Sequence, residues 1–159
     1  MAVHLRKARI QDVKGIHRLL LESPAGEGLV LPRSFSQIYS QLRDYFVMAE
    51  RETGEIAACC ALNITWDNLA EVRSLKVRAD LRGQGLGRQL IEACLSEALT
   101  LGIYRVFVLT NTPAFFARLG FGETTKDELP QKVWADCINC PKFPDCDEVA
   151  MLMDLSEEG

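Results

Sequence analysis

The 159-residue chain lacks an excess of basic residues: it has 18 Lys and Arg against 22 Asp and Glu, a formal net charge of -4. Domains that bind nucleic acid usually carry a basic patch, so this balance argues against DNA or RNA as the main partner. The chain also lacks an apolar run long enough to span a membrane, and its first residues lack the apolar core of a signal peptide. We therefore expect a cytoplasmic protein with no membrane partner.

Histidine is scarce, and no pattern of acid–base partners surrounds either His4 or His17. We expect both on the surface, one on a strand and one on a helix. The six cysteines of a cytoplasmic protein are expected to be thiols or metal ligands rather than a disulfide framework. What is present, 48% hydrophobic and 25% charged residues, is typical of a globular protein, and residues 1–159 are expected to form a single domain.

Local patterns predict most of the helices and strands. Alternation predicts a strand over 2–8, and apolar spacing predicts a helix over 12–21 that buries Val13, Ile16, Leu19 and Leu20. The segment 34–37 is a capping box, which is expected to open a short helix that buries Phe35, Ile38 and Leu42. Strands are expected at 45–50 and 55–64, and Asp67–Asn68 is expected to turn the chain into a central strand.

The segment over residues 71–110 organises the chain. A strand over 71–77 leads into a glycine-rich turn over 82–87, which opens directly into an apolar-faced helix and then a second strand over 105–109. Alternating glycines remove the Cβ atoms that would keep an anion away from the backbone. The free N–H groups and positive dipole end of the helix would face that anion. The turn therefore predicts a pyrophosphate site, with Arg78, Arg82 and Arg88 as mobile positive charges around it.

The spacing excludes two common phosphate motifs. The dinucleotide fingerprint requires G-x-G-x-x-G, whereas this turn has G-x-G-x-G. The mononucleotide P-loop requires Gly-Lys-Ser/Thr, whereas Gly87 is followed by Arg88. What remains is R-x-x-G-x-G, formed by Arg82, Gly85 and Gly87. An ordinary glycine-rich turn without a ligand is the alternative interpretation.

On this motif the sequence resembles the GNAT superfamily of acyl-CoA-dependent N-acyltransferases, over about residues 5–121 and a final strand near 148–155. The resemblance implies an α/β (α+β) fold with a mixed, mostly antiparallel central sheet, splayed between the fourth and fifth strands and flanked by about four helices. It also implies acetyl-CoA as co-substrate, with the backbone of residues 75–77 holding the pantetheine and polarising the thioester carbonyl. The cofactor-binding residues expected from it are Leu75, Lys76, Val77, Arg82, Gly83, Gln84, Gly85, Leu86, Gly87, Arg88, Asn111 and Phe115.

The same resemblance implies that Glu71 is the general base, because related branches place a glutamate at this position of the strand. A solvated carboxylate at a strand edge is the alternative. A helix following Thr112 and Pro113 resembles the family's helix beside the thioester. Many members have tyrosine as the acid for the departing thiolate where this chain has Phe116, which cannot donate a proton.

Four stretches bear on the acceptor: residues 31–34 (Leu-Pro-Arg-Ser), 70–72 (Ala-Glu-Val), 107–110 (Phe-Val-Leu-Thr) and 128–130 (Glu-Leu-Pro). They resemble short, single-domain bacterial N-acetylglutamate synthases. These imply L-glutamate as acceptor, in the first step of arginine biosynthesis, with Arg33 and Arg73 as substrate-binding residues. A second arginine of the long synthases is missing, and Arg73 or Lys142 is a candidate to replace it. Two alternative acceptors are another small amine and a protein amino group. An alternative of another class is a non-catalytic module that senses acyl-CoA or is stabilised by zinc. A homodimer is left open.

Three cysteines near the C-terminus, Cys137, Cys140 and Cys146, show half of a zinc-knuckle spacing. Zinc binding, redox chemistry and a turn packed near the acceptor site all remain open for them. No metal site is assigned.

Overall fold

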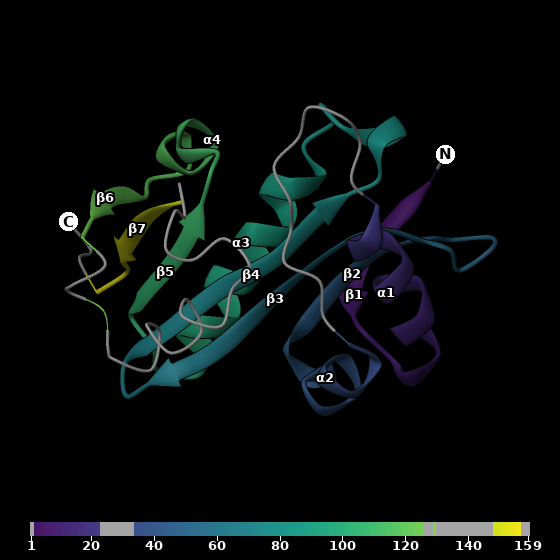
Figure 1. The fold of residues 1–159 in the computed structure, drawn as a ribbon, viewed down its shortest axis with the longest axis horizontal. Helices are drawn as coiled ribbons and strands as arrows, with labels where there is room; N and C mark the ends of the chain where they lie inside the picture. Colours follow the sequence, from purple (N-terminus) through teal and green to yellow (C-terminus); the bar gives the residue numbers. More distant parts are fainter. Residues whose placement is uncertain (1, 23–33, 126–128, 130–147, 157–159) are drawn as a thin grey trace. The chain divides into compact units, whose positions relative to one another are not determined.

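A computed structural model describes residues 2–22, 34–125, 129 and 148–156 of the chain (Figure 1). Its strands are β1 Val3–Lys7, β2 Tyr45–Glu50, β3 Ile56–Trp66, β4 Leu69–Val77, β5 Arg105–Thr110, β6 Gly122–Thr124 and β7 Val149–Asp154. Its helices are α1 Val13–Leu21, α2 Phe35–Ser40, α3 Leu86–Thr100 and α4 Pro113–Arg118, and short 3-10 turns lie at Ile10–Asp12, Leu42–Asp44 and Ala79–Leu81.

The strands form one seven-stranded sheet in the order β1-β2-β3-β4-β5-β7-β6. β4 and β5 run parallel, with Ala70 opposite Val106 and Glu71 opposite Phe107. The pairs β1–β2, β2–β3, β5–β7 and β6–β7 are antiparallel. The predicted fold class, a mixed and mostly antiparallel sheet with four helices, is confirmed. The divergence of β4 from β5 beyond these pairs stays a prediction.

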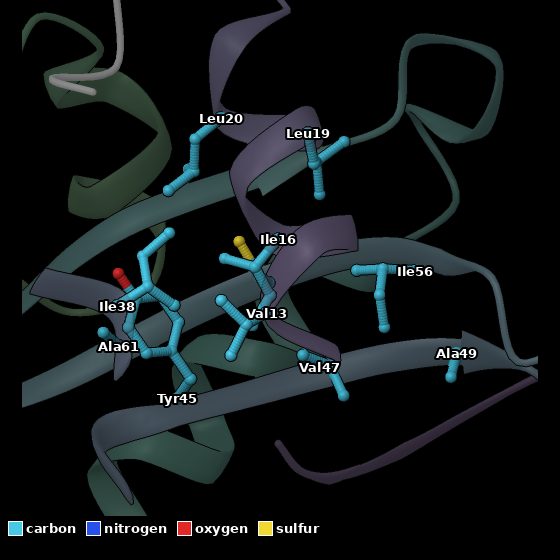
Figure 2. Close-up of a cluster of buried hydrophobic side chains, with 11 residues drawn as sticks. Val13, Ile16, Leu19, Leu20, Ile38, Tyr45, Val47, Ala49, Ile56 and Ala61 are labelled. Atoms are coloured by element: carbon cyan, nitrogen blue, oxygen red, sulfur yellow. The ribbon is translucent and has the colours of Figure 1, made fainter. Parts of the chain in front are cut away.

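Close contacts divide the chain into two compact units, residues 1–62 with 72–96 and residues 63–71 with 97–159. The core of the first unit lies between α1, α2 and the strands β2 and β3. Figure 2 shows the α1 side chains directed at the two strands. The four α1 residues predicted to be buried are at most 3% exposed: Val13, Ile16, Leu19 and Leu20. The helical spacing therefore identified the buried face correctly.

The α2 capping box also forms as predicted. The Ser34 hydroxyl accepts a 3.1 Å hydrogen bond from the Gln37 amide, and the Gln37 side chain accepts one of 2.8 Å from the Ser34 amide. The prediction that Phe35 is buried is wrong, because the ring is 44% exposed. It stacks instead on His17 of α1, with ring centroids 4.0 Å apart, so His17 is a partly buried packing residue.

The core of the second unit is built from β5, β7 and the end of the β3–β4 hairpin. Its buried residues include Leu69, Phe107, Leu129 and Ala150. Asn68 adopts a left-handed φ of 56° in the hairpin turn, and its side-chain oxygen accepts a 2.6 Å hydrogen bond from the amide of Tyr104. The turn predicted at Asp67–Asn68 is thus confirmed.

The described cysteines Cys59, Cys60 and Cys94 are free, buried thiols. Cys94 Sγ lies 3.8 Å from Cys60 Sγ. The hydrogen bond with Cys94, together with burial, raises the pKa of Cys60 well above its usual value. These three residues are therefore buried core thiols outside a disulfide.

The close packing of α1 on β3 depends on Gly15. A Cβ at Gly15 would lie 2.8 Å from Cγ1 and 3.3 Å from Cβ of Ile56. In an exposed helix, Gly→Ala gains up to about 1 kcal/mol, but overpacking a core costs about 1–3 kcal/mol. We therefore expect Gly15→Ala to lower the free energy of unfolding, measured by urea denaturation. In an Ile56→Ala background, which removes Cγ1, the nearer of the two opposing atoms, the same change should cost clearly less. A stabilising effect in the wild-type background would contradict this packing.

Candidate active site

The glycine-rich loop belongs to the first unit and connects β4 to α3. Gly83 and Gly85 have φ values of 80° and 83°, in the left-handed region that other residues rarely adopt. A Cβ at either position would meet no atom within 4 Å, so the space beside both glycines is open. Leu86 begins α3 with its side chain 8% exposed, whereas Gly87 already lies in the first turn. The backbone of the loop is therefore bare on the side where a ligand phosphate would approach the helix N-terminus.

Two of the three arginines predicted around this loop remain exposed. Arg82 is an exposed residue directly before Gly83. Arg88 is 66% exposed and forms a 3.1 Å ion pair with Glu92, one helical turn away. An exposed pair of this kind is worth little in free energy, so a bound phosphate would compete for the guanidinium at small cost.

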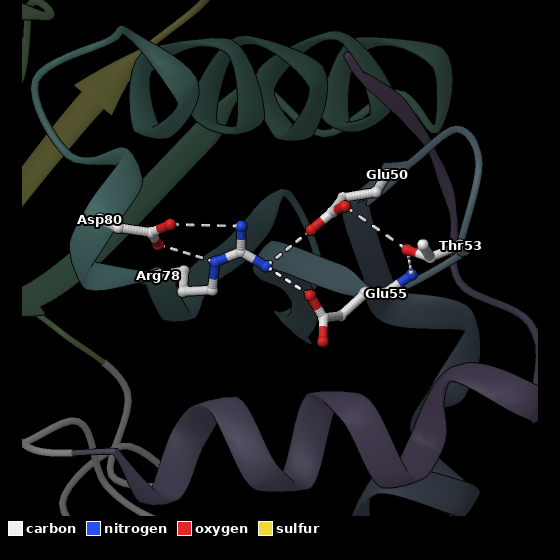
Figure 3. A network of polar contacts seen from close by, with 5 residues as sticks. All are labelled: Glu50, Thr53, Glu55, Arg78 and Asp80. Carbon is white, nitrogen blue, oxygen red and sulfur yellow. Dashed lines mark hydrogen bonds and ion pairs between the residues drawn. The ribbon is translucent and has the colours of Figure 1, made fainter. Parts of the chain in front are cut away.

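The prediction that Arg78 is a mobile cation is wrong. Its Nη1 atom lies 2.9 Å from Glu50 Oε2 and 2.8 Å from Glu55 Oε1, and its Nε atom lies 2.7 Å from Asp80 Oδ1. Figure 3 shows the guanidinium held between Asp80 on one side and the two glutamates on the other. The hydrogen bonds that Arg78 donates to Asp80 and Glu50 raise its pKa above the ordinary value. This charge ties the end of β4 to the β2–β3 turn.

Strand β4 contains an unusual backbone residue directly before residues 75–77. Ser74 has a φ of 58°, a conformation that costs a non-glycine residue roughly 1–2 kcal/mol. Strain of this kind often marks a functional segment. It changes the direction of the peptide groups next to the residues expected to contact the pantetheine. The sequence analysis missed Ser74, because a serine within a strand pattern carries no signal of a left-handed conformation.

The side chains of the predicted pantetheine segment differ in burial. Leu75 and Val77 are partly buried, whereas Lys76 is 5% exposed. Lys76 Nζ donates a 2.6 Å hydrogen bond to the carbonyl of Glu22, which follows the last residue of α1. The sequence analysis considered the backbone of Lys76 and missed its side chain.

The predicted base, Glu71, lies in the second unit. It is partly buried, stands opposite the fully buried Phe107 of β5, and is flanked by buried Ala70 and Val72. A partly buried carboxylate inside a parallel strand pair differs from the solvated strand-edge carboxylate of the alternative interpretation. Its role as a base stays a prediction.

Asn111 and Phe115, both predicted cofactor residues, follow β5 in the second unit. Asn111 is exposed, and the turn around it is fixed by Thr110 Oγ1, which accepts a 2.9 Å hydrogen bond from the Thr112 amide. Phe115 is partly buried and packs edge-on against Phe116, with ring centroids 5.0 Å apart. Thr112 occupies the N-cap position of α4 without a side-chain capping bond.

Several predicted residues lie outside the described part of the chain: Arg33, Lys142 and the cysteines Cys137, Cys140 and Cys146. Arg73 is described, partly buried, in β4. Over the described ranges, no group of three or more His, Cys, Asp or Glu side chains is placed to hold a metal ion. Helices in the same ranges are all too short or too polar to cross a membrane.

A small pocket of about 60 Å³ lies under α1, lined in part by Arg18, Glu22, Glu55 and Arg78. Small-molecule sites usually occupy about 300–1,000 Å³. This pocket has room for a few water molecules and is too small to be the substrate site.

The mixed sheet and the bare glycine loop at the start of α3 define a class, the acyl-CoA-dependent N-acyltransferases. Comparison with known proteins agrees. The sequence model of the Acetyltransferase (GNAT) family matches residues 14–121. The chain therefore belongs to the GNAT acetyltransferase family, and it is an acetyl-CoA-dependent N-acetyltransferase.

Among its relatives, an uncharacterised N-acetyltransferase of Chlorobaculum tepidum is 42% identical over 95% of this chain and 96% of its own length. An amino-acid acetyltransferase of Mycobacterium tuberculosis is 33% identical over 75% of this chain and 68% of its own length. The chain covers only 29% of the longer amino-acid acetyltransferase of Mannheimia succiniciproducens, to which it is 34% identical.

Solved structures with a similar fold include an N-acetyltransferase bound to coenzyme A. The N-acetylglutamate synthase of Neisseria gonorrhoeae, complexed with coenzyme A and N-acetyl-glutamate, superposes with a TM-score of 0.81 at 25% identity, over 98% of this chain and 35% of that protein. The M. tuberculosis protein Rv2747, in complex with CoA, gives a TM-score of 0.78 at 27% identity, over 96% of this chain and 99% of that one.

The loop geometry leads to a test of cofactor binding. Gly85→Val should abolish measurable acetyl-CoA binding in calorimetry, because its side chain would fill the open space beside the backbone. Gly54→Val is the matched control: Gly54 has a similar φ of 76° and equally open surroundings, but lies in the β2–β3 turn. The two variants should lose similar thermal stability, since both strain the backbone. Full binding by Gly85→Val would exclude this loop as the phosphate site.

Proposed function

We propose that this enzyme transfers the acetyl group of acetyl-CoA to the α-amine of L-glutamate, the first step of arginine biosynthesis, in the cytoplasm. The observation that carries the proposal is the combined likeness to an amino-acid acetyltransferase at 33% identity and to the fold of an N-acetylglutamate synthase. Acetylation of a different small amine is the second candidate, since the relative at 42% identity is known only as an N-acetyltransferase.

In the proposed reaction, the neutral amine attacks the thioester carbonyl; a C–N bond forms, the C–S bond breaks, and coenzyme A leaves as a thiolate. The bare loop at Gly83 and Gly85 would bind the pyrophosphate, and the backbone of residues 75–77 would hold the pantetheine and stabilise the developing oxyanion. Glu71 would take the proton that the amine loses. Glutamate carries two carboxylates, and each needs a charge-assisted partner. Arg33 is proposed for one of them.

The base role of Glu71 is tested by Glu71→Gln. A general base contributes roughly 10²–10⁴ in rate, so turnover at neutral pH should fall at least tenfold. The loss should shrink at high pH, where the free amine is already neutral. Glu123→Gln, at an exposed position of β6, is the control and should keep full activity. Equal rates for wild type and Glu71→Gln at all pH values would assign Glu71 a structural role.

The acceptor is tested by Arg33→Ala, assayed with glutamate, glutamine and aspartate against spermidine. Removing a guanidinium that pairs with a bound carboxylate costs roughly 2–5 kcal/mol, so KM for glutamate should rise strongly. KM for acetyl-CoA should be unchanged, because the glycine loop is a separate element. Arg43→Ala, at an exposed arginine before β2, serves as the control. Better turnover of spermidine than of glutamate, or no loss in Arg33→Ala, would show that glutamate is the wrong acceptor.

A further inference from the structure

Arg78 is held through its backbone at the point where β4 ends. Its amide donates a 2.8 Å hydrogen bond to the carbonyl of Ala57 in β3, and its own carbonyl accepts a 2.9 Å bond from the amide of Leu81. Leu81 is 8% exposed and is the last residue of the 3-10 turn Ala79–Leu81. The next four residues, 82–85, form the exposed part of the glycine loop. The loop therefore follows a short turn that starts at Arg78 and ends at a buried leucine.

The side chain of Arg78 joins this turn to the β2–β3 hairpin. On one side, Asp80 of the turn accepts two hydrogen bonds, of 2.7 Å from Nε and 3.4 Å from Nη2. On the other side, Nη1 donates to Glu50 and Glu55, which flank the β2–β3 turn (Figure 3). A two-pronged contact fixes the orientation of a carboxylate as well as its distance. These four residues, the Arg78 network, therefore orient the turn before the glycine loop against the hairpin.

Neither stability nor attraction of phosphate explains the Arg78 network. Glu55 and Asp80 are 57% and 61% exposed, and exposed ion pairs contribute little to the free energy of unfolding. The network holds one guanidinium against three carboxylates, so its excess charge is negative and would repel a phosphate. What it supplies is geometry. Gly83 and Gly85 are conformationally permissive, so the shape of the loop depends on how its ends are held.

We infer that Arg78 is a positioning residue for the cofactor loop: by holding Asp80 against the β2–β3 hairpin, it sets the position of the loop amides and so the affinity for acetyl-CoA. This inference rests on the proposed function, in which the glycine loop binds the pyrophosphate. Loop amides bind a phosphate well only when several N–H groups are directed at it together. A turn that is not held at its start leaves only a fraction of the loops competent, and the apparent affinity falls by that fraction.

The experiment separates positioning from electrostatics by the sign of the effect. Asp80→Ala breaks the network on the loop side, and Glu52→Ala, at an exposed glutamate of the β2–β3 turn that is not one of the four network residues, is the matched control. Each change removes one negative charge, so electrostatics alone predicts that both variants bind the anionic acetyl-CoA as well as the wild type or more tightly. The inference predicts weaker binding by Asp80→Ala and no change in Glu52→Ala.

In calorimetry, Asp80→Ala should raise Kd for acetyl-CoA about tenfold, the effect of leaving about one loop in ten competent. Arg78→Lys keeps the positive charge but replaces the forked guanidinium with a single ammonium, so its Kd should rise as well. For both variants, kcat at saturating acetyl-CoA and KM for the amine acceptor should match the wild type, because only the loop is affected. Asp80 is an exposed residue, so the test holds even if Arg78→Lys fails to fold.

A lower thermal stability of Asp80→Ala with an unchanged Kd would show that the network is merely structural, and tighter binding would show that its charge is what matters; either result overturns the inference. If Gly85→Val loses acetyl-CoA binding while Asp80→Ala keeps it, the inference fails and the proposed phosphate site stands. Full binding by Gly85→Val would remove the loop from the site and overturn both.

Discussion

Compensation of buried charge is the constraint on which the first unit depends. Arg6 hydrogen-bonds Asp12 at 2.7 and 3.1 Å, beneath the start of α1. Burial alone would raise the pKa of Asp12, but the Arg6 guanidinium and the Arg9 amide outweigh it and hold that pKa below its ordinary value. The stability from this pair is therefore fully present above the ordinary carboxyl range and is lost as pH falls through the lowered pKa. In the same way, Arg78 joins the β2–β3 turn to the end of β4 through three carboxylates.

The backbone imposes a second constraint, on the segment that would receive acetyl-CoA. Left-handed φ values at Gly83 and Gly85 turn the chain sharply between β4 and α3 without side chains over the turn. Glycine adopts this conformation at no steric cost, whereas Ser74 adopts it at a steric cost. An exposed turn made by glycines and a strained serine thus bracket residues 75–77. Arg82 and Arg88 are exposed beside the turn, and Arg88 pairs with Glu92.

Short-range patterns explain which predictions were correct. The buried face of α1 follows from helical spacing alone, and the Ser34–Gln37 capping box requires only residues three apart. The errors concern contacts between segments distant in sequence. Arg78 meets Glu50 across 28 residues, which no local pattern reveals. Phe35 was predicted to be a core residue because its side chain is apolar, but its ring lies partly exposed and stacks on the ring of His17.

In the candidate site too, local patterns predicted some features, and contacts between distant segments were missed. The glycine loop was identifiable, because positive φ and open space are what a G-x-G-x-G turn demands. The burial of Lys76 was not, because its partner Glu22 is 54 residues away and lysine is almost always exposed. Ser74 and Lys76 share the buried face of β4, and the sequence alone does not show which face of that strand is buried.

The environment of Phe116 bears on how the thiolate leaves. The ring is 3% exposed and packs edge-on against both Phe115 and Phe121, with centroids 5.0 and 5.4 Å apart. A tyrosine hydroxyl here would need a hydrogen-bond partner within an aromatic cluster, at a cost of about 1–3 kcal/mol if none were found. Phenylalanine avoids that cost, but it cannot supply the proton that the resemblance places at this position in many family members. A thiol has a pKa of about 8.5, so a thiolate departs near neutral pH with little need for prior protonation. In the proposed reaction, acetyl transfer would therefore depend on positioning and on removal of the amine proton more than on a dedicated acid.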